Sequence, residues 1–285
     1  MTEQLARAAL FNAIEAGHPF WSSEISTRGA LAVHERLLSG GYDSIKNEKL
    51  ISEIRQMSGE QVLAIIDAHQ ARLITPVDED WPLQVNDLAA PPIALILKGN
   101  IGALHQPSLA IVGTRNPTSY GARIAGDFAA GFADREWAIV SGGAYGIDSY
   151  AHKGALIAEG VTVAVIASGI DINYPAGNTR LFVEICESGA IVTEFMPGHR
   201  ALPHRFLTRN RLIASLSKAT LVVEAAFRSG SLRTARDAAE IFRPVMAIPG
   251  PINSPTSEGC HRLIGERAAE IVTSVADAVE FVGAN

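Results

Sequence analysis

Basic side chains gather between residues 200 and 250. Nine arginines and lysines stand there against three acids, a local balance of +6 in a chain whose net charge is −6. A positive segment within an acidic protein favours a polyanionic partner, because the chain as a whole does not attract one. The alternative is a solvated helix face with scattered arginines. Two clusters favour binding, since each opens a predicted helix, where backbone N–H groups attract anions: Arg209-Asn210-Arg211 and Ser229-Gly230-Ser231.

A second candidate site follows the apolar run 109–112, where the sequence reads Gly113-Thr114-Arg115. Glycine lets a backbone approach a ligand, the Thr114 hydroxyl can form hydrogen bonds, and the planar guanidinium of Arg115 suits phosphate. These residues are therefore predicted to contact an anion. The alternative is that Gly113 only makes a turn and Arg115 is an ordinary surface charge.

A glycine-rich loop, S-G-G-A-Y-G-I-D at 141–148, leads from a predicted strand into a predicted helix. Such a loop directs backbone N–H groups and the positive end of the helix dipole at an anion. The G-x-G-x-x-G spacing of dinucleotide-binding proteins is absent, and so is the acid that would hold a ribose. Asp148 is expected to cap the helix rather than act as an acid, and His152 is expected to be structural.

Two aromatic residues and one arginine follow the next predicted strand. Tyr174 and Phe182 could stack on nucleic-acid bases, which is worth about 1–3 kcal/mol per base. Packing in the core is the alternative for both rings. Arg180 could reach a phosphate.

Several other kinds of site are excluded. His199 and His204 stand five residues apart and lack a completing acid, so no zinc site is expected. The sequence contains neither the P-loop pattern nor G-x-S-x-G. Cys186 and Cys260 are expected to be free thiols in a reducing cytoplasm. The longest apolar run, 161–167, is too short to span a membrane.

The elements that must position these residues form two predicted domains. Residues 1–75 favour a small helical domain, in which Ser58 and Gln61 predict a capping box. Residues 76–285 are predicted to form the second domain, whose first part, 76–92, is a linker laid over it.

Short apolar runs alternate with helical segments from residue 93 onward, which predicts an α/β fold: a mostly parallel sheet with helices on both faces. Ligands bind such sheets beyond the carboxyl ends of the strands, where the candidate residues stand. Strands are expected at 93–97, 109–112, 138–140, 161–166, 190–192, 220–223 and 245–248. Helices are expected at about 119–134, 148–159, 178–188, 208–216, 231–242 and 257–267.

Five sequence blocks occur in the order and at close to the spacing of a known family: 141–148 with Ala151-His152, Tyr174-Pro175 with Asn178, 209–217, 229–235 and Pro249-Gly250. Over residues 75 to 270 the chain resembles the DNA-processing protein A (Smf) family. The resemblance implies an extended Rossmann-like domain that binds single-stranded DNA, preceded by a sterile-alpha-motif-like helical domain.

It also implies a homodimer, a role in natural transformation and loading of the RecA recombinase. Because the sequence shows no complete catalytic constellation, neither catalysis nor a cofactor or metal is expected. The residues expected to bind DNA, from the motifs and the resemblance together, are Gly113, Thr114, Arg115, Ser141, Gly142, Gly143, Gly146, Asn178, Arg180, Phe182, Arg209, Asn210, Arg211, Ser229, Gly230 and Ser231.

The sequence departs from the family pattern at three places. The usual F-P-x-R-N-R lacks its proline, because Leu207 follows Phe206. Histidine replaces asparagine at His261, and Arg267-Ala268 replaces glycine-alanine. The winged-helix domain that many members append is not expected here.

Two other functions remain as alternatives. A phosphoribohydrolase of similar fold would carry P-G-G-x-G-T-x-x-E, but the comparable region 227–234 has no acid at that spacing. A NAD-dependent oxidoreductase would require the dinucleotide fingerprint that the loop at 141–148 lacks.

Overall fold

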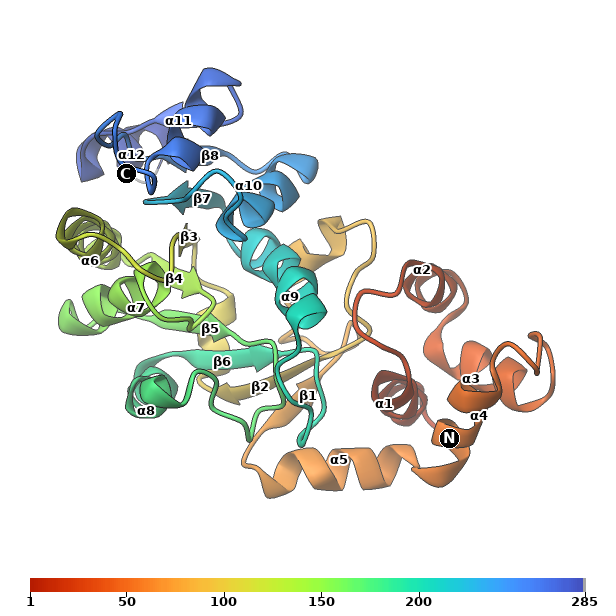
Figure 1. Ribbon diagram of the computed structural model, residues 1–285. Helices are drawn as coiled ribbons and strands as arrows, with labels where there is room; N and C mark the ends of the chain where they lie inside the picture. Colours follow the sequence, from red (N-terminus) through yellow and green to blue (C-terminus); the bar gives the residue numbers. More distant parts are fainter. Residues whose placement is uncertain (284–285) are drawn as a thin grey trace.

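The chain begins with a group of helices that has its own hydrophobic core (Figure 1). The computed structural model describes residues 1–283. The helices are α1 (Glu3–Ala13), α2 (Pro19–Arg28), α3 (Ala30–Leu38), α4 (Glu48–Gln56) and α5 (Gly59–Ala68). Leu10, Trp21 and Leu37 are among the residues buried between them. The predicted capping box of Ser58 and Gln61 is confirmed at the start of α5.

Within the described residues, nine strands form one sheet in the order β1-β2-β6-β5-β4-β3-β7-β8-β9. Their bounds are β1 (Arg72–Ile74), β2 (Leu95–Gly99), β3 (Ser108–Val112), β4 (Ala138–Ser141), β5 (Thr162–Val165), β6 (Ala190–Thr193), β7 (Ala219–Val222), β8 (Val245–Ala247) and β9 (Glu270–Ile271). Strand β2 is antiparallel to β1 and β6, and the other pairs are parallel. The predicted mostly parallel sheet is confirmed.

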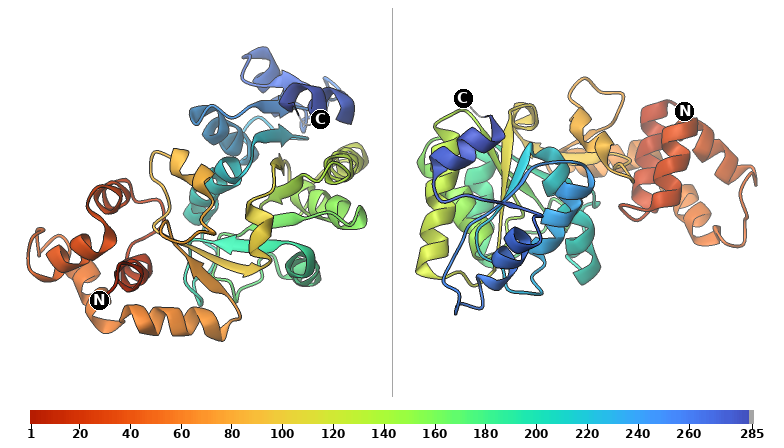
Figure 2. Two further views of the ribbon diagram at one scale, coloured as in Figure 1. Left: turned by 180° about the vertical axis from the view of Figure 1, so that it is seen from behind. Right: turned by 90° about the horizontal axis from the view of Figure 1, so that it is seen from above.

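Helices cover both faces of the sheet, as predicted (Figure 2). They are α6 (Ser119–Ala133), α7 (Ile147–Ile157), α8 (Thr179–Ser188), α9 (Pro203–Leu216), α10 (Ser231–Glu240), α11 (Glu258–Gly265) and α12 (Val275–Val282), with short turns η1 (Leu83–Asp87), η2 (Ile101–Leu104) and η3 (Ala176–Asn178). Buried residues of α6, α7 and α12 pack on one face, and those of α9, α10 and α11 pack on the other. Among residues 1–283, no helix is both long and apolar enough to cross a membrane.

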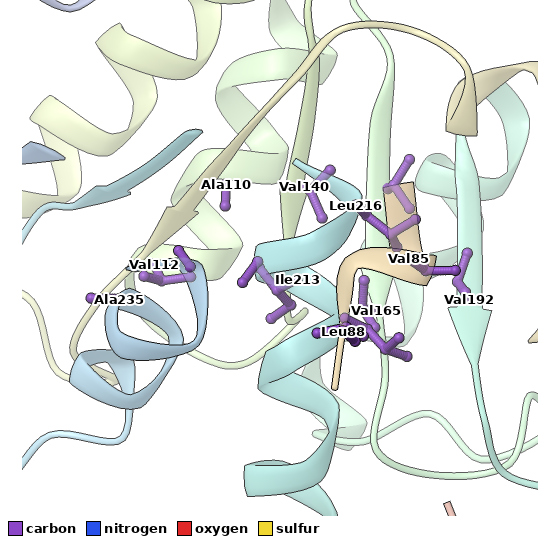
Figure 3. Close-up of a cluster of buried hydrophobic side chains, with 14 of the residues drawn as sticks. Val85, Leu88, Ala110, Val112, Val140, Val165, Val192, Ile213, Leu216 and Ala235 are labelled. Atoms are coloured by element: carbon purple, nitrogen blue, oxygen red, sulfur yellow. The ribbon is translucent and has the colours of Figure 1, made fainter. Parts of the chain in front are cut away.

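Successive residues of each central strand serve opposite faces, which explains why the strands are apolar throughout. Ala110 and Val112 of β3 lie in the cluster with Ile213 of α9 and Ala235 of α10 (Figure 3). Leu109 and Ile111 of the same strand lie in the opposite cluster, with α6 and α7.

The segment predicted as a linker, 76–92, lies on this packed face. Val85 and Leu88 are buried in the cluster with α9, as Figure 3 shows. Helix α9 begins at Pro203, five residues earlier than predicted, because proline is favoured at the first helical position. The short elements β1, β9 and α12 were not predicted.

The helical group also shares a core with the sheet. Phe11 of α1 and Ile66 of α5 lie in one buried cluster with Ile96 of β2 and Leu181 of α8. The division into domains at residue 75 therefore stays a prediction.

Candidate nucleic-acid interface

A cleft of about 750 Å³ opens at the carboxyl ends of β3 and β7, between the loops that follow them and helix α9. A smaller recess of about 50 Å³ adjoins it. Both are lined by Arg115, Ala144, Tyr174, Ala201 and Phe206. The cleft therefore lies where ligands of open α/β sheets bind.

Arg115 stands on the loop between β3 and α6 and is exposed to solvent. Its guanidinium carbon lies 5.1 Å from the centroid of the Phe206 ring, which is a cation–π arrangement. Gly113 allows the chain after β3 to pass close to Ile147 and the backbone of Glu224, because a Cβ at this position would overlap with both. The structure thus places Gly113, Thr114 and Arg115 together in the cleft.

Arg209 forms part of the cleft lining although it is 5% exposed. Its Nη1 donates a hydrogen bond to the Val165 carbonyl oxygen at 2.8 Å. Burial lowers the pKa of Arg209 to about 10, an effect that the charge of Asp148 opposes and that of Arg115 reinforces. Gly142 permits this packing, because a Cβ there would collide with the guanidinium.

The glycine-rich loop does not offer several of its amides to a ligand, contrary to the prediction. The N–H groups of Gly142 and Ala144 donate to Asp148 Oδ2 at 3.2 and 3.3 Å, and that of Ile147 donates to the Thr114 oxygen at 3.1 Å. Burial raises the pKa of Asp148, which the nearby charge of Arg209 opposes. Asp148 lies within the first turn of α7 and is not its N-cap, which is Gly146.

Other residues predicted to bind DNA instead form hydrogen bonds that support the glycine-rich loop. The Asn178 amide donates to the Gly143 oxygen at 2.9 Å and to Ser149 Oγ at 2.8 Å. Buried Ser141 donates to the Ile111 oxygen at 2.6 Å. Asn178, Ser141 and Gly143 are therefore placed to hold the loop in shape.

Two predicted DNA contacts conflict with the structure. Phe182 is 3% exposed and packs under Gly143, so its ring cannot stack on a base, and the core alternative is correct. Arg211 points away from the cleft, where it forms a buried ion pair with Glu194 at 2.6 Å and donates to the Ala90 oxygen at 2.8 Å. Burial raises the pKa of Glu194, and Arg211 opposes that rise.

Arg180 is not part of the lining of the cleft. Its side chain is 93% exposed and pairs with Glu184 of the same helix at 2.8 Å. The structure therefore gives Arg180 no place among the clustered residues.

The start of α10 forms the far wall of the cleft. Ser229, Gly230 and Ser231 line it, with the two serine hydroxyls 2.7 Å apart. Asn210 of α9 ties this wall to the floor, because its amide donates to the Gly230 oxygen at 3.2 Å. The first N–H groups of α10 already donate within the turn, that of Ser231 to Ser229 Oγ at 3.4 Å and that of Leu232 to the Ser229 oxygen at 3.2 Å. The serine hydroxyls, rather than the amides, are therefore the groups that could contact a phosphate.

Three residues were not predicted as DNA contacts: Phe206 and Arg228, which line the cleft, and Tyr145, which lines the recess. The Tyr174 and Phe206 rings lie 5.5 Å apart at the cleft and its recess, and Arg228 adds a charge beside Ser229. Helical spacing could have identified Phe206, because residues three and four apart share a face, as Phe206 does with Arg209 and Asn210.

The charged lining of the cleft within residues 1–283 consists of three arginines and one buried aspartate: Arg115, Arg209, Arg228 and Asp148. In the same part of the chain, no group of three or more His, Cys, Asp or Glu side chains could hold a metal ion. The arrangement is positive and aromatic, which is suited to a nucleic-acid strand.

Comparison with known proteins agrees with this chemistry. The model of the family described as DNA recombination-mediator protein A matches residues 72–283. A relative from Mycobacterium tuberculosis is 42% identical over 262 residues, which are 85% of this chain and 67% of that protein.

Two solved structures are similar over long stretches. The X-ray structure of DNA processing protein A from Streptococcus pneumoniae has a TM-score of 0.83 and 33% identity, and 95% of each chain is covered. DNA processing protein A from Helicobacter pylori, described with its single-stranded DNA binding mode, has a TM-score of 0.68 and 28% identity, covering 75% of this chain and 95% of that one. The chain belongs to the DNA recombination-mediator protein A family.

Proposed function

We propose that the protein binds single-stranded DNA in this cleft. The observation that carries the proposal is the exposed Arg115 beside Phe206 and Tyr174, at the carboxyl edge of the sheet. Aromatic faces hold unpaired bases and arginines hold the phosphates between them, whereas a duplex hides its base faces. The single-stranded DNA binding described for the Helicobacter pylori relative supports the same assignment.

The bound strand is then passed on rather than cut. In this proposal the protein protects incoming single strands during natural transformation and helps to load a RecA-type recombinase, acting as a homodimer. Family membership supports this role. A non-catalytic role is also consistent with Asp148, whose Oδ2 atom already accepts two loop amides. Incubation with AMP should release no adenine, and release would favour the phosphoribohydrolase alternative.

Arg115→Ala tests the cleft. We expect about tenfold weaker binding of an oligo-dT strand, because one charge-assisted phosphate contact is lost. The slope of log K against log salt should become shallower by about 0.7, the value for one phosphate contact to a single strand. Fluorescence anisotropy at several salt concentrations, with duplex as competitor, measures both.

Arg135→Ala is the matched control. Arg135 is an exposed arginine just after α6 and before β4, so it lies at the opposite edge of the sheet from the cleft. Replacing Arg135 should leave the slope of log K against log salt unchanged. Equal affinities of wild type and Arg115→Ala at moderate salt would contradict the proposed site.

A further inference from the structure

Glu224 is a buried carboxylate beside the cleft that the binding of DNA does not explain. It lies two residues beyond β7 and is 4% exposed. A negative charge close to a site for phosphate opposes binding by Coulomb repulsion. A carboxylate in this position therefore requires a compensating role.

The contacts of Glu224 define that role. Its backbone oxygen accepts the Thr114 N–H at 2.7 Å. Its carboxylate accepts the Thr118 N–H at 2.9 Å and the Thr118 hydroxyl at 2.7 Å. The Thr256 hydroxyl lies 3.3 Å from the same carboxylate. One residue thus holds both ends of the segment 114–118.

Arg115 lies between these two fixed ends. Within the segment, the Asn116 N–H donates to Thr114 Oγ1 at 3.2 Å, and the Thr114 oxygen accepts the Ile147 N–H at 3.1 Å. The backbone of the segment is therefore held at Thr114 and Thr118, which directs the guanidinium toward Phe206.

We propose that Glu224 is a positioning residue for single-stranded DNA binding: its backbone oxygen holds Thr114 and its carboxylate holds Thr118, so that Arg115 between them faces the cleft. The inference rests on the proposed function, because Arg115 must contact the strand for its position to matter. A merely structural role is the competing explanation. Thr118 is the N-cap of α6 and Gly121 packs against the carboxylate, so Glu224 also supports the start of that helix.

Glu224→Gln separates these explanations. The side chain keeps its size but loses its charge and one of the two oxygens that hold Thr118, whereas the backbone bond to Thr114 remains. Only the Thr118 end of the segment is therefore loosened, and Arg115 should face the cleft less often. We expect severalfold weaker binding of oligo-dT, at most the tenfold loss caused by Arg115→Ala, and a salt slope shallower by up to about 0.7. Charge alone predicts the opposite sign, since removing an acid near the cleft should strengthen binding.

A double-mutant cycle then identifies the partner of Glu224. Because both changes remove the same contact, Arg115→Ala/Glu224→Gln should bind no more weakly than Arg115→Ala alone. The matched cycle uses Arg228, another arginine of the cleft lining. There the two losses should multiply, because Arg228 lies outside the 114–118 segment.

Thr118 supplies an independent variant if Glu224→Gln does not fold, as judged by thermal unfolding. Thr118→Ala removes the hydroxyl that donates to Glu224 and should weaken binding severalfold, whereas Thr118→Ser keeps it and should restore most of the affinity. Tighter or equal binding by Glu224→Gln, or losses that multiply with Arg115→Ala, would overturn the positioning role. If Arg115→Ala itself binds normally, the proposed cleft fails together with this inference. A loss with Arg115→Ala but not with Glu224→Gln or Thr118→Ala rejects the inference alone.

Discussion

Arg209 and Arg211 show how two identical side chains, two positions apart on one helix, take opposite roles. Successive residues of an α-helix are rotated by about 100°, so these two arginines point to nearly opposite sides. Arg209 lies in the cleft lining, and Arg211 forms its ion pair with Glu194 behind it. The R-N-R motif therefore contributes Arg209 to the proposed DNA site, whereas Arg211 holds the helix in place through its ion pair.

His152 gives a pH-dependent prediction at the residue scale. It is completely buried, and its Nδ1 lies 2.7 Å from Thr162 Oγ1. The Thr162 hydroxyl donates to the Ile139 oxygen at 2.7 Å, so its oxygen accepts from a proton on His152 Nδ1. Burial, and then the charge of Arg209, lower the pKa of His152 from 6.5 to about 3.

Folding therefore favours the neutral ring, and its contribution to stability is fully present above pH 6.5. The contribution is lost as the pH falls from 6.5 toward 3, because only the unfolded chain takes up the proton. Between pH 6.5 and 5 the free energy of unfolding should fall by about 1–2 kcal/mol from this residue. His152→Asn keeps a donor near Thr162 without titrating, so urea unfolding across this range should show a shallower dependence. Parallel pH profiles of the two proteins would contradict the assignment.

At the scale of elements, α9 connects the cleft to the N-terminal helices. One side carries Phe206 and Asn210 into the cleft. The other side carries Arg205, which forms a two-pronged ion pair with Glu15 at 2.9 and 3.1 Å and lies 4.8 Å over the Phe195 ring. The position of the cleft floor thus depends on contacts made by the helical group.

Glu15→Gln tests this connection. Glu15 is half exposed, so loss of the pair should lower the free energy of unfolding by about 0.5–1 kcal/mol. Because salt screens such pairs, the difference from wild type should shrink in high salt. Urea midpoints at two salt concentrations measure it, and Glu35→Gln, at an exposed carboxylate on α3, is the control. A salt-independent difference would indicate a packing effect instead.

The central strands could be predicted closely because burial on both faces makes them apolar throughout. The short edge strand β9 could not, since both of its residues are exposed and leave no apolar run. The sequence also predicted which loops line the cleft, but not which acceptors their N–H groups bond to. The acceptance of two loop amides by Asp148 depends on side-chain geometry that residue types and spacing do not specify.

At the scale of the whole molecule, the helical group and the sheet share buried surface. Phe11 of α1 packs with Ile96 and Leu181, while the neighbouring Leu10 lies in the core of the helical group. Helix α1 therefore belongs to two cores at once. Shared burial of this kind couples the stability of both parts.

We accordingly predict that the two parts unfold in one transition. Trp21 reports on the helical group and Trp137 on the sheet. Variants that keep only Trp21 or only Trp137, with the third tryptophan, Trp81, also replaced, should give coincident denaturation curves. Phe11→Ala should cost about 3–5 kcal/mol and separate the curves, because it removes a large side chain between the parts. Separate curves in the wild-type background would contradict the coupling and support independent domains.

The hydrogen bonds between the loop amides and Asp148 have a consequence for the rate at which DNA associates with the protein. A loop that already satisfies its own hydrogen bonds needs no ligand to become ordered. The incoming strand therefore meets a preorganised surface, and binding costs no conformational entropy for ordering the loop. The association rate should be governed by diffusion and electrostatic attraction rather than by a slow conformational step.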